Sequence, residues 1–303
     1  MPLPKPAGDF SIGFFRQEKS SYSMFIIIGF VVVLVSVIVG YILSHGNLGI
    51  LFQPFEFMII FGAAFGAFIA SNSSFTLKLA VKGIGHAFGN GPTKNHYMEM
   101  LALLYGLFAK MQREGIIAIE KDIEQPESSA LFTRFPLMVK DKAACYFIGD
   151  TLRIYLTTGN GNELDKLMGV DMGAMHEEEM LPAHSVSHMA DSMPGMGIVA
   201  AVLGIVITMG YIDRPPMELG GHIGAALVGT FLGILLCYGF VGPIGAKMET
   251  LAHERHLYFR AIKEAVGAAV RGSSPIVALE YGRRAIPLAF RPTFLEMEKK
   301  LKG

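Results

Sequence analysis

Long uncharged apolar runs alternate along the chain with charged stretches, and this pattern predicts a helical membrane protein. The first run extends from Met24 to Leu43, and the second, from Phe57 to Ala70, can be extended back to about Leu51. Two more run from Met193 to Ile212 and from Ile223 to Gly245. A helix needs roughly 20 residues to cross hydrocarbon about 30 Å thick. Each run therefore predicts one transmembrane helix.

Outside these runs, apolar residues recur at helical spacing among charged ones. This periodicity predicts amphipathic helices over His96–Arg113 and Lys142–Leu156, and a third over Asn162–Ala190 that leads into the third span. Lys247–Val270 continues the fourth span, and a last helix begins near Ile276. Strand signals are scarce. The predicted fold class is all-α, a four-span transmembrane helical protein with a helical cytoplasmic domain.

The alternation also divides the chain into five parts. They are an N-terminal cytoplasmic extension (1–23), transmembrane helices 1 and 2 (24–70), a cytoplasmic helical domain (71–192), transmembrane helices 3 and 4 (193–245) and C-terminal cytoplasmic helices (246–303). Residues 1–23 mix aromatic and basic side chains, so either a short interfacial helix or a loose tail is compatible with them.

Composition agrees with a membrane protein and does not favour nucleic-acid binding or a disulfide-stabilised fold. Hydrophobic residues make up 51% of the chain, and the mean hydropathy is +0.43. Lys plus Arg equal Asp plus Glu at 26 each, so electrostatics do not favour nucleic acid as a partner. The two cysteines, Cys145 and Cys237, are too far apart to predict a disulfide framework or a metal site. The N-terminus does not have the pattern of a cleavable signal peptide.

The distribution of positive charge predicts the orientation. Of the 26 lysines and arginines, only Arg214 lies in either of the two short hairpins that join spans one to two and three to four. Loops rich in Lys and Arg stay in the cytoplasm. We therefore expect a multi-pass protein of the plasma membrane with both termini and the large middle segment in the cytoplasm.

Small residues occupy one face of each of the last two spans. On the third span they are Gly197, Ala200, Ala201 and Gly204; on the fourth they are Ala226, Gly229, Thr230 and Gly233. Faces of this kind let two helix backbones come close together in lipid. Either the two helices pack on each other or on copies of themselves, or they line a path or seat a partner helix.

The spans have no ionisable side chain near their middle. Glu56 and Asp213 sit at span ends, and Thr208 and Thr230 are the polar groups available at depth. A carrier of protons or sodium needs a group that can bind and release the ion inside the membrane. If the protein conducts ions, the carboxylate must therefore come from another chain.

Two prolines mark the same spans. Pro194 opens the third span, where a first-turn proline sacrifices no helical hydrogen bond. Pro243 lies near the cytoplasmic end of the fourth span, where it predicts a kink and a hinge between membrane and cytoplasm.

Enzyme and metal signatures are missing from the sequence. His184 and His188 share a helical face, but a metal site needs a third ligand and none is suggested nearby. The glycines fit neither the phosphate-binding nor the dinucleotide-binding pattern, and Ser, His and acid residues show no catalytic spacing. We expect neither an enzyme, nor a cofactor, nor a bound metal.

Several separate motifs follow one another along the chain. They are Gly46–Gly49, Gln53–Glu56, Ser192–Pro194 with Gly197–Ala201, Val228–Leu236 with Tyr238, Gly239 and Pro243, Glu280–Arg284, and Arg291–Phe294. Together they resemble the flagellar motor stator subunits of the MotA family, within the MotA/TolQ/ExbB proton channels. The resemblance covers about Met24 to Lys300 and leaves residues 1–23 outside it.

The resemblance implies a ring of subunits, thought to be five, around the membrane helices of two MotB-type peptidoglycan-binding partners in the bacterial inner membrane. The partner's aspartate would carry the ion, and the ring would transmit torque to the rotor protein FliG. The family's two prolines match Pro194 and Pro243, and its threonine facing the ion path matches Thr230. Sodium-driven relatives have a second threonine where this chain has Ala201. Because an alanine side chain offers Na⁺ no oxygen ligand, protons are favoured.

The rotor contact in such proteins uses one acidic and one basic residue. The acidic position matches Glu120. The basic position falls on Gln112, with Arg113 one residue later, and a shift of one residue turns a helix by about 100°. Arg113 is the candidate substitute. The alternative is that Arg113 and Glu120 merely belong to a solvated surface.

Three other functions remain open at this stage. They are an ExbB/TolQ-like subunit of an ion-driven energy-transducing complex, a sodium-driven stator subunit, and a membrane scaffold without ion flux. The four predicted spans argue against the first, since ExbB/TolQ-like proteins usually have three.

Overall fold

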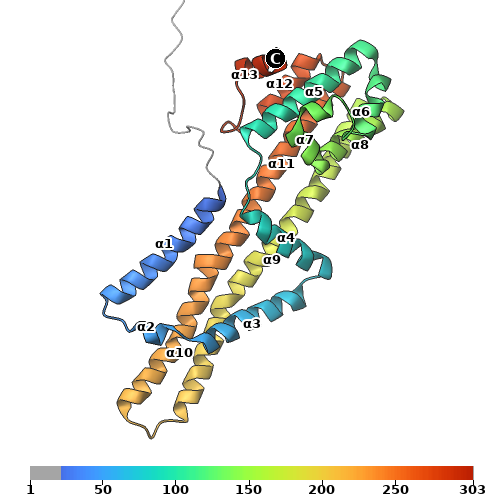
Figure 1. Ribbon diagram of the computed structural model, residues 1–303. Coiled ribbons are helices and arrows are strands. Elements are labelled where there is room, and N and C mark those ends of the chain that lie inside the picture. The colour runs from blue at the N-terminus through green and yellow to red at the C-terminus, as the bar shows by residue number, and fades with distance from the viewer. Residues whose placement is uncertain (1–21, 303) are drawn as a thin grey trace, which may run out of the picture.

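The computed structural model describes residues 22–302, and every regular element in this range is helical (Figure 1). The α-helices that carry the membrane spans are α1 (Tyr22–Leu43), α2 (Leu48–Leu51), α3 (Pro54–Ser71), α9 (Gly161–Met209), α10 (Pro216–Leu236) and α11 (Gly242–Val270). The parts of α9 and α11 that extend beyond the spans form what we call the stalk. The remaining α-helices are α4 (Ser74–Ala87), α5 (Lys94–Glu114), α6 (Glu120–Glu124), α7 (Pro136–Lys140), α8 (Lys142–Thr158), α12 (Pro275–Ala285) and α13 (Phe294–Lys302). Two 3₁₀ turns, η1 (Ile116–Ile119) and η2 (Phe132–Arg134), and one π turn, η3 (Cys237–Val241), complete the chain.

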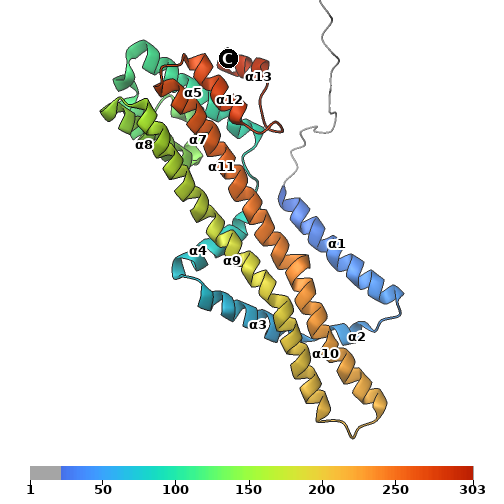
Figure 2. The same ribbon diagram turned by 180° about the vertical axis from the view of Figure 1, so that it is seen from behind.

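Two long antiparallel rods form the axis of the molecule. One is the 49-residue helix α9, and the other is α10 followed by η3 and α11. At 1.5 Å per residue, α9 spans roughly 70 Å, about twice the thickness of the hydrocarbon core. Figures 1 and 2 show the short helices α5 to α8, α12 and α13 gathered at one end of these rods and the α9–α10 hairpin at the other.

Among residues 22–302, four helical segments are long and apolar enough to cross a membrane, which agrees with the four predicted spans. They are Met24–Leu43, Leu48–Ser71, and portions of Gly161–Met209 and Pro216–Val270. The backward extension of the second span to Leu51 is not one continuous helix, however, because α2 ends there and Phe52 and Gln53 are not helical. Pro54 explains the break, since it disfavours helical geometry in the residue before it and suits the first turn of α3.

The end of the molecule where the short helices gather has its own hydrophobic core, to which the predicted amphipathic faces contribute. Tyr97, Leu104 and Ile148 are almost fully buried there, together with Phe259 of α11 and Leu279 of α12. The predicted helices over His96–Arg113 and Lys142–Leu156 are confirmed as α5 and α8. Gly115 ends α5 with φ +86°, a conformation that residues with a side chain adopt only under strain.

The two prolines behave differently from each other. Pro194 lies in the interior of α9, so the prediction that it opens a helix is wrong. The amphipathic stretch before it joins the apolar span without interruption, and the neighbouring helices hold the segment helical. Pro243 stands in the first turn of α11, directly after the π turn η3. The backbone thus has one widened turn just before Pro243, and the predicted kink at Pro243 stays a prediction.

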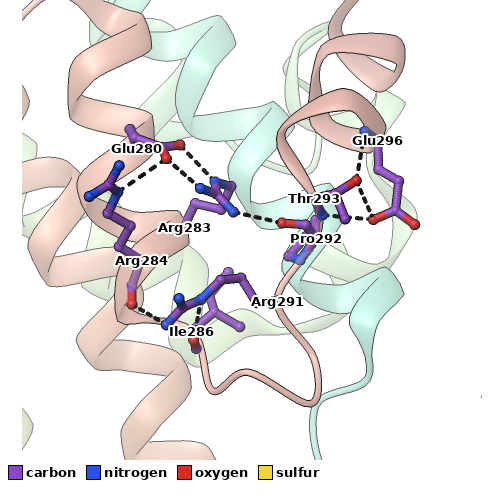
Figure 3. A network of polar contacts seen from close by, with 8 residues as sticks. All are labelled: Glu280, Arg283, Arg284, Ile286, Arg291, Pro292, Thr293 and Glu296. Atoms are coloured by element: carbon purple, nitrogen blue, oxygen red, sulfur yellow. Dashed lines mark hydrogen bonds and ion pairs between the residues drawn. The ribbon is translucent and has the colours of Figure 1, made fainter. Parts of the chain in front are cut away.

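The C-terminus contains a helix that the sequence analysis missed. A helix does begin at Pro275, as predicted, but it is not the last, because α13 follows. The signal was available in Thr293 and Glu296, which exchange hydrogen bonds as a capping box. Arg283 and Arg291 order the connecting loop by donating to backbone carbonyls of Pro292 and Ile286 (Figure 3). The two alternatives for residues 1–23 fall largely outside the described residues.

Candidate functional site

The small-residue faces of the third and fourth spans pack against each other. A Cβ atom added to Gly197 would lie 2.8 Å from the carbonyl oxygen of Gly229, and one added to Gly233 would lie 2.6 Å from that of Met193. Further out, a Cβ on Gly204 would lie 2.7 Å from the Cβ of Ala226. Within the chain, the structure therefore shows the first of the two predicted arrangements, in which the third and fourth spans pack on each other. We call this contact the α9–α10 seam.

The predicted ion-path residues flank this seam. Ala200 and Ala201 are buried in it, and Thr230 is half-buried with part of its side chain accessible. Thr208 is different, because its hydroxyl donates to the carbonyl of Gly204 one turn earlier, at 2.8 Å, and the residue is buried. Thr230 is therefore the less buried of the two threonines, and its role in ion passage stays a prediction.

Glu56 reaches the seam, which the sequence analysis did not anticipate. It lies in the first turn of α3, and its carboxylate oxygens are 3.3 Å from a Cβ placed on Gly229 and 3.5 Å from one placed on Gly204. Its Oε2 is buried and has no hydrogen-bond partner among the described residues. No sequence pattern gives the crossing of α3 over α9 and α10, so Glu56 was read only as a charge at a helix end.

The face of α3 that carries Glu56 also holds the helix against the rods. Ile60 and Ala64 are fully buried in a cluster with Met193 and Ala200 of α9 and Cys237 of η3. This packing fixes the first turn of α3, and with it Glu56, over the seam. The small residues on α9 and α10 leave room for the carboxylate where larger side chains would exclude it.

The π turn before Pro243 is where α1 meets the rods. The rings of Phe30 and Phe240 are 5.2 Å apart, and Gly239 lies beside Val33. Pro243 itself is exposed, and Pro194 is half-buried within α9. The hinge role predicted for Pro243 stays a prediction.

The residues predicted to contact a rotor lie at the end of the molecule opposite the α9–α10 hairpin (Figure 1). Gln112 and Arg113 are exposed in the last turn of α5, and Glu120 is exposed at the start of α6. Because Gly115 ends α5, Arg113 and Glu120 do not lie on one continuous helix. The Nε of Arg113 donates to the carbonyl of Ala109 in its own helix, at 3.3 Å.

One acidic residue near Glu120 is buried. Asp122 is 8% exposed, accepts a hydrogen bond from Ser129 at 2.6 Å and pairs with Lys110 at 2.8 Å. This pair fixes α6 to α5, and therefore fixes Glu120 relative to Arg113. His184 and His188 are both exposed, and no cluster of three or more candidate metal ligands occurs in residues 22–302.

An ion-pair network stabilises the junction between the stalk helices α9 and α11 and the hydrophobic core formed with α5 and α8. Arg255 of α11 donates two hydrogen bonds to Asp141, at 2.5 and 2.6 Å, and lies 3.9 Å from Glu179 of α9. Burial raises the pKa of Glu179 to about 7, more than the attraction of Arg255 lowers it. Asp141 also caps α8, so one guanidinium connects three elements.

Comparison with known proteins identifies the family. Residues 27–115 match the model of the motility protein A N-terminal region, and residues 145–260 match that of the MotA/TolQ/ExbB proton channel family. Motility protein A of Salmonella typhimurium is 39% identical over 92% of this chain and 96% of its own length. This chain belongs to the motility protein A family. LafT of Vibrio parahaemolyticus, named a chemotaxis protein, is 36% identical over 90% of this chain and 97% of its own length.

Solved structures show the same fold. The C. jejuni MotAB structure superposes with a TM-score of 0.74 at 20% identity and covers 88% of this chain and 96% of that one. The flagellar MotAB stator complex of Bacillus subtilis superposes with a TM-score of 0.67 at 21% identity. That alignment covers 84% of this chain and 92% of the Bacillus subtilis chain. As a motility protein A of the proton channel family, the chain is a subunit of the flagellar stator.

Proposed function

We propose that this chain conducts protons with a MotB-type partner and converts the proton motive force into torque on the rotor protein FliG. The observation that carries the proposal is the 39% identity to motility protein A over nearly the whole chain. The spans add a physical argument. The carboxylate nearest the ion path is Glu56, at one end of α3, so the acid that carries the proton across the middle of the membrane is supplied by the partner.

The chain works as a ring of copies, five in our proposal, around the partner helices. The α9–α10 seam is closed within one chain, so other faces must contact the partner, neighbouring copies and lipid. The opposite side of α9 offers such a face, with Val199, Val202 and Val206 exposed by 47%, 53% and 63%. Apolar residues repeated at this spacing on a span suit helix packing or lipid contact.

Protons are the proposed coupling ion. Ala201 has no oxygen with which to coordinate a sodium ion that has lost its water, and Thr230 provides a single hydroxyl. A proton needs fewer ligands, since a carboxylate and a chain of water molecules suffice.

The cytoplasmic end contacts the rotor through Arg113 and Glu120. The orientation follows from the concentration of Lys and Arg in this part of the chain, which places it in the cytoplasm. The membrane is the bacterial inner membrane, because that is where the proton motive force acts.

The test is complementation of a non-motile strain that lacks its own stator genes. Co-expression of this chain with its single-span partner restores swimming and raises proton flux through inverted vesicles. Changing the partner's intramembrane Asp to Asn abolishes both while leaving the complex assembled. Flux from this chain expressed alone contradicts the proposal, and restored import across an outer membrane without swimming favours an ExbB/TolQ-like role.

A further inference from the structure

A cleft of about 640 Å³ opens at the cytoplasmic end between α5, the segment 130–135 and α13. Its floor is one face of α5, on which Ala102, Gly106 and Ala109 follow one another at helical spacing. A Cβ on Gly106 would lie 2.6 Å from a methyl group of Leu131. The cleft therefore exists because the floor residues are small and let the 130–135 segment approach α5.

Cations from three separate elements line this cleft. Lys110 and Arg113 come from α5, Arg134 from η2, and Lys299 and Lys300 from α13. The acidic lining residues are Glu114 and Asp122, and the carboxylate of Asp122 is already occupied by Lys110 and Ser129. Arg134, Lys299 and Lys300 are exposed. The cleft thus concentrates positive charge that the chain itself leaves largely uncompensated.

Contacts with the rest of the chain hold α13 in its position. Lys94 at the start of α5 pairs with Glu296 at 2.7 Å, Thr293 and Glu296 cap the helix, and Met297 is buried in the core. The side of α13 that carries Lys299 and Lys300 is thereby held beside the cleft. The loop that leads into α13 is ordered by the Arg283 and Arg291 contacts drawn in Figure 3.

We propose that this cleft binds a small organic phosphate, with its phosphate groups between Arg134 and the two lysines of α13 and its organic part against Tyr105 and Phe135. Guanidinium and ammonium groups that converge from several directions suit the compact charge of a phosphate and its several oxygens. Tyr105 and Phe135 are half-buried in the wall and offer aromatic surface. The volume falls in the range of small-molecule sites, roughly 300–1,000 Å³.

Two other anionic ligands fit less well. The helices α5 and α13, which line the cleft, lie at the end of the molecule opposite the α9–α10 hairpin (Figure 1), so the cleft is remote from lipid head groups at the spans. An acidic peptide spreads its carboxylates along an extended backbone, whereas these cations surround one compact space. Binding does not depend on the proposed torque function, although an occupied cleft would neutralise charge beside Arg113.

The test is calorimetric titration of the full-length chain, purified with its partner, with inorganic pyrophosphate and with ADP at fixed ionic strength. We expect saturable binding, at least tenfold weaker in both Arg134→Glu and Lys300→Glu. The control is Lys140→Glu, an exposed lysine that does not line the cleft, and it should bind within twofold of wild type. If Arg134→Glu disturbs assembly, Arg134→Gln replaces it, because glutamine removes the positive charge without reversing it.

Several outcomes would overturn the proposal. They are binding to none of the phosphate probes, equal affinity for sulfate, affinity unchanged in the cleft variants, and preference for a glutamate-rich peptide over ADP. Size-exclusion profiles and thermal unfolding midpoints of the variants must match those of wild type, so that lost binding reports on the cleft.

Discussion

At the scale of single residues, the glycines of the α9–α10 seam have a role that composition does not reveal. Gly197 and Gly195 lie two positions apart in the same helix, yet a Cβ on the first would lie 2.8 Å from a backbone oxygen, whereas the second faces open space. In a membrane, close backbone contact is the main source of attraction between helices. The pair therefore allows a matched test of the seam.

We predict that Gly197→Ala destabilises the protein by about 1–3 kcal/mol, because the added methyl group forces the two helices apart. Gly195→Ala should have little effect or stabilise slightly, since alanine is the better helix former. Thermal unfolding of the purified complex in detergent measures both. Equal midpoints for the two variants would show that the seam tolerates separation.

Glu56 supplies the second residue-scale prediction. Its buried, unpaired Oε2 at the seam is suited to hold a proton or accept a hydrogen bond from water near one end of the ion path. Glu56→Gln keeps the shape but cannot release a proton. We expect assembly to be retained and proton flux in vesicles to fall about tenfold or more.

The control for this substitution is Glu218→Gln. Glu218 also lies in the first turn of a span but is exposed and pairs with Arg214 at 3.2 Å. Its replacement should leave flux within about twofold, as is usual for exposed ion pairs. Wild-type flux in Glu56→Gln would exclude Glu56 from the proton path.

At the scale of elements, the stalk formed by α9 and α11 contains a close pair of histidines. The rings of His176 and His256 are 4.5 Å apart, and the Nδ1 of His176 is buried without a partner. Burial lowers the pKa of His256, and the nearby His176, His253 and Arg260 lower it further. This contact therefore disfavours the charged imidazole.

The sign of the stability effect follows from this shift. Because the pKa of His256 is lower in the folded chain than its ordinary value of about 6.5, the unfolded chain binds the proton first as the pH falls. The His256 contribution to stability is therefore lost as the pH drops below about 6.5. Glu179 acts in the opposite direction, because its raised pKa makes the folded chain bind that proton first. We predict that lowering the pH from 7.5 to 5.5 shifts the unfolding midpoint of His256→Gln upward relative to that of the wild type, because the variant loses only the His256 contribution. His188→Gln, at an exposed site on α9, should keep the wild-type dependence.

At the scale of the whole molecule, two long rods connect the membrane spans to the cytoplasmic end. The α9 rod is continuous through Pro194, and the other changes register at η3 before Pro243. Since helices are stiff, a displacement of the seam would be carried along the rods to the core that presents Arg113 and Glu120. In the proposed function, this continuity would connect ion passage mechanically to the rotor contact.

For the rotor contact we predict that Glu120→Lys reduces swimming speed at least severalfold without changing the amount of complex in the membrane. The reason is electrostatic, because Glu120 is exposed and held in place by the Lys110–Asp122 pair. Glu177→Lys, an exposed reversal on the stalk, serves as the control. Normal swimming of Glu120→Lys, measured by cell tracking, would remove Glu120 from the rotor interface.

The sequence by itself determined the number of spans, the amphipathic helices and the lack of an acid at mid-membrane. These properties depend on which residues follow one another at intervals of three and four, and on whether a run of about 20 residues contains charge. The family was visible in the same way, because its motifs are short and local. Even Thr293 and Glu296, which begin α13, form a local signal that could have been used.

Only the tertiary structure decided which surfaces meet. It placed Glu56 on glycines that lie about 150 residues away in the chain, kept α9 helical through Pro194, and brought Lys299 and Lys300 beside α5. The physical reason is that a helical pattern predicts which face of a helix is buried but does not identify the segment that packs against that face. That choice depends on packing between segments far apart in the chain, where shape and burial act on many residues at once.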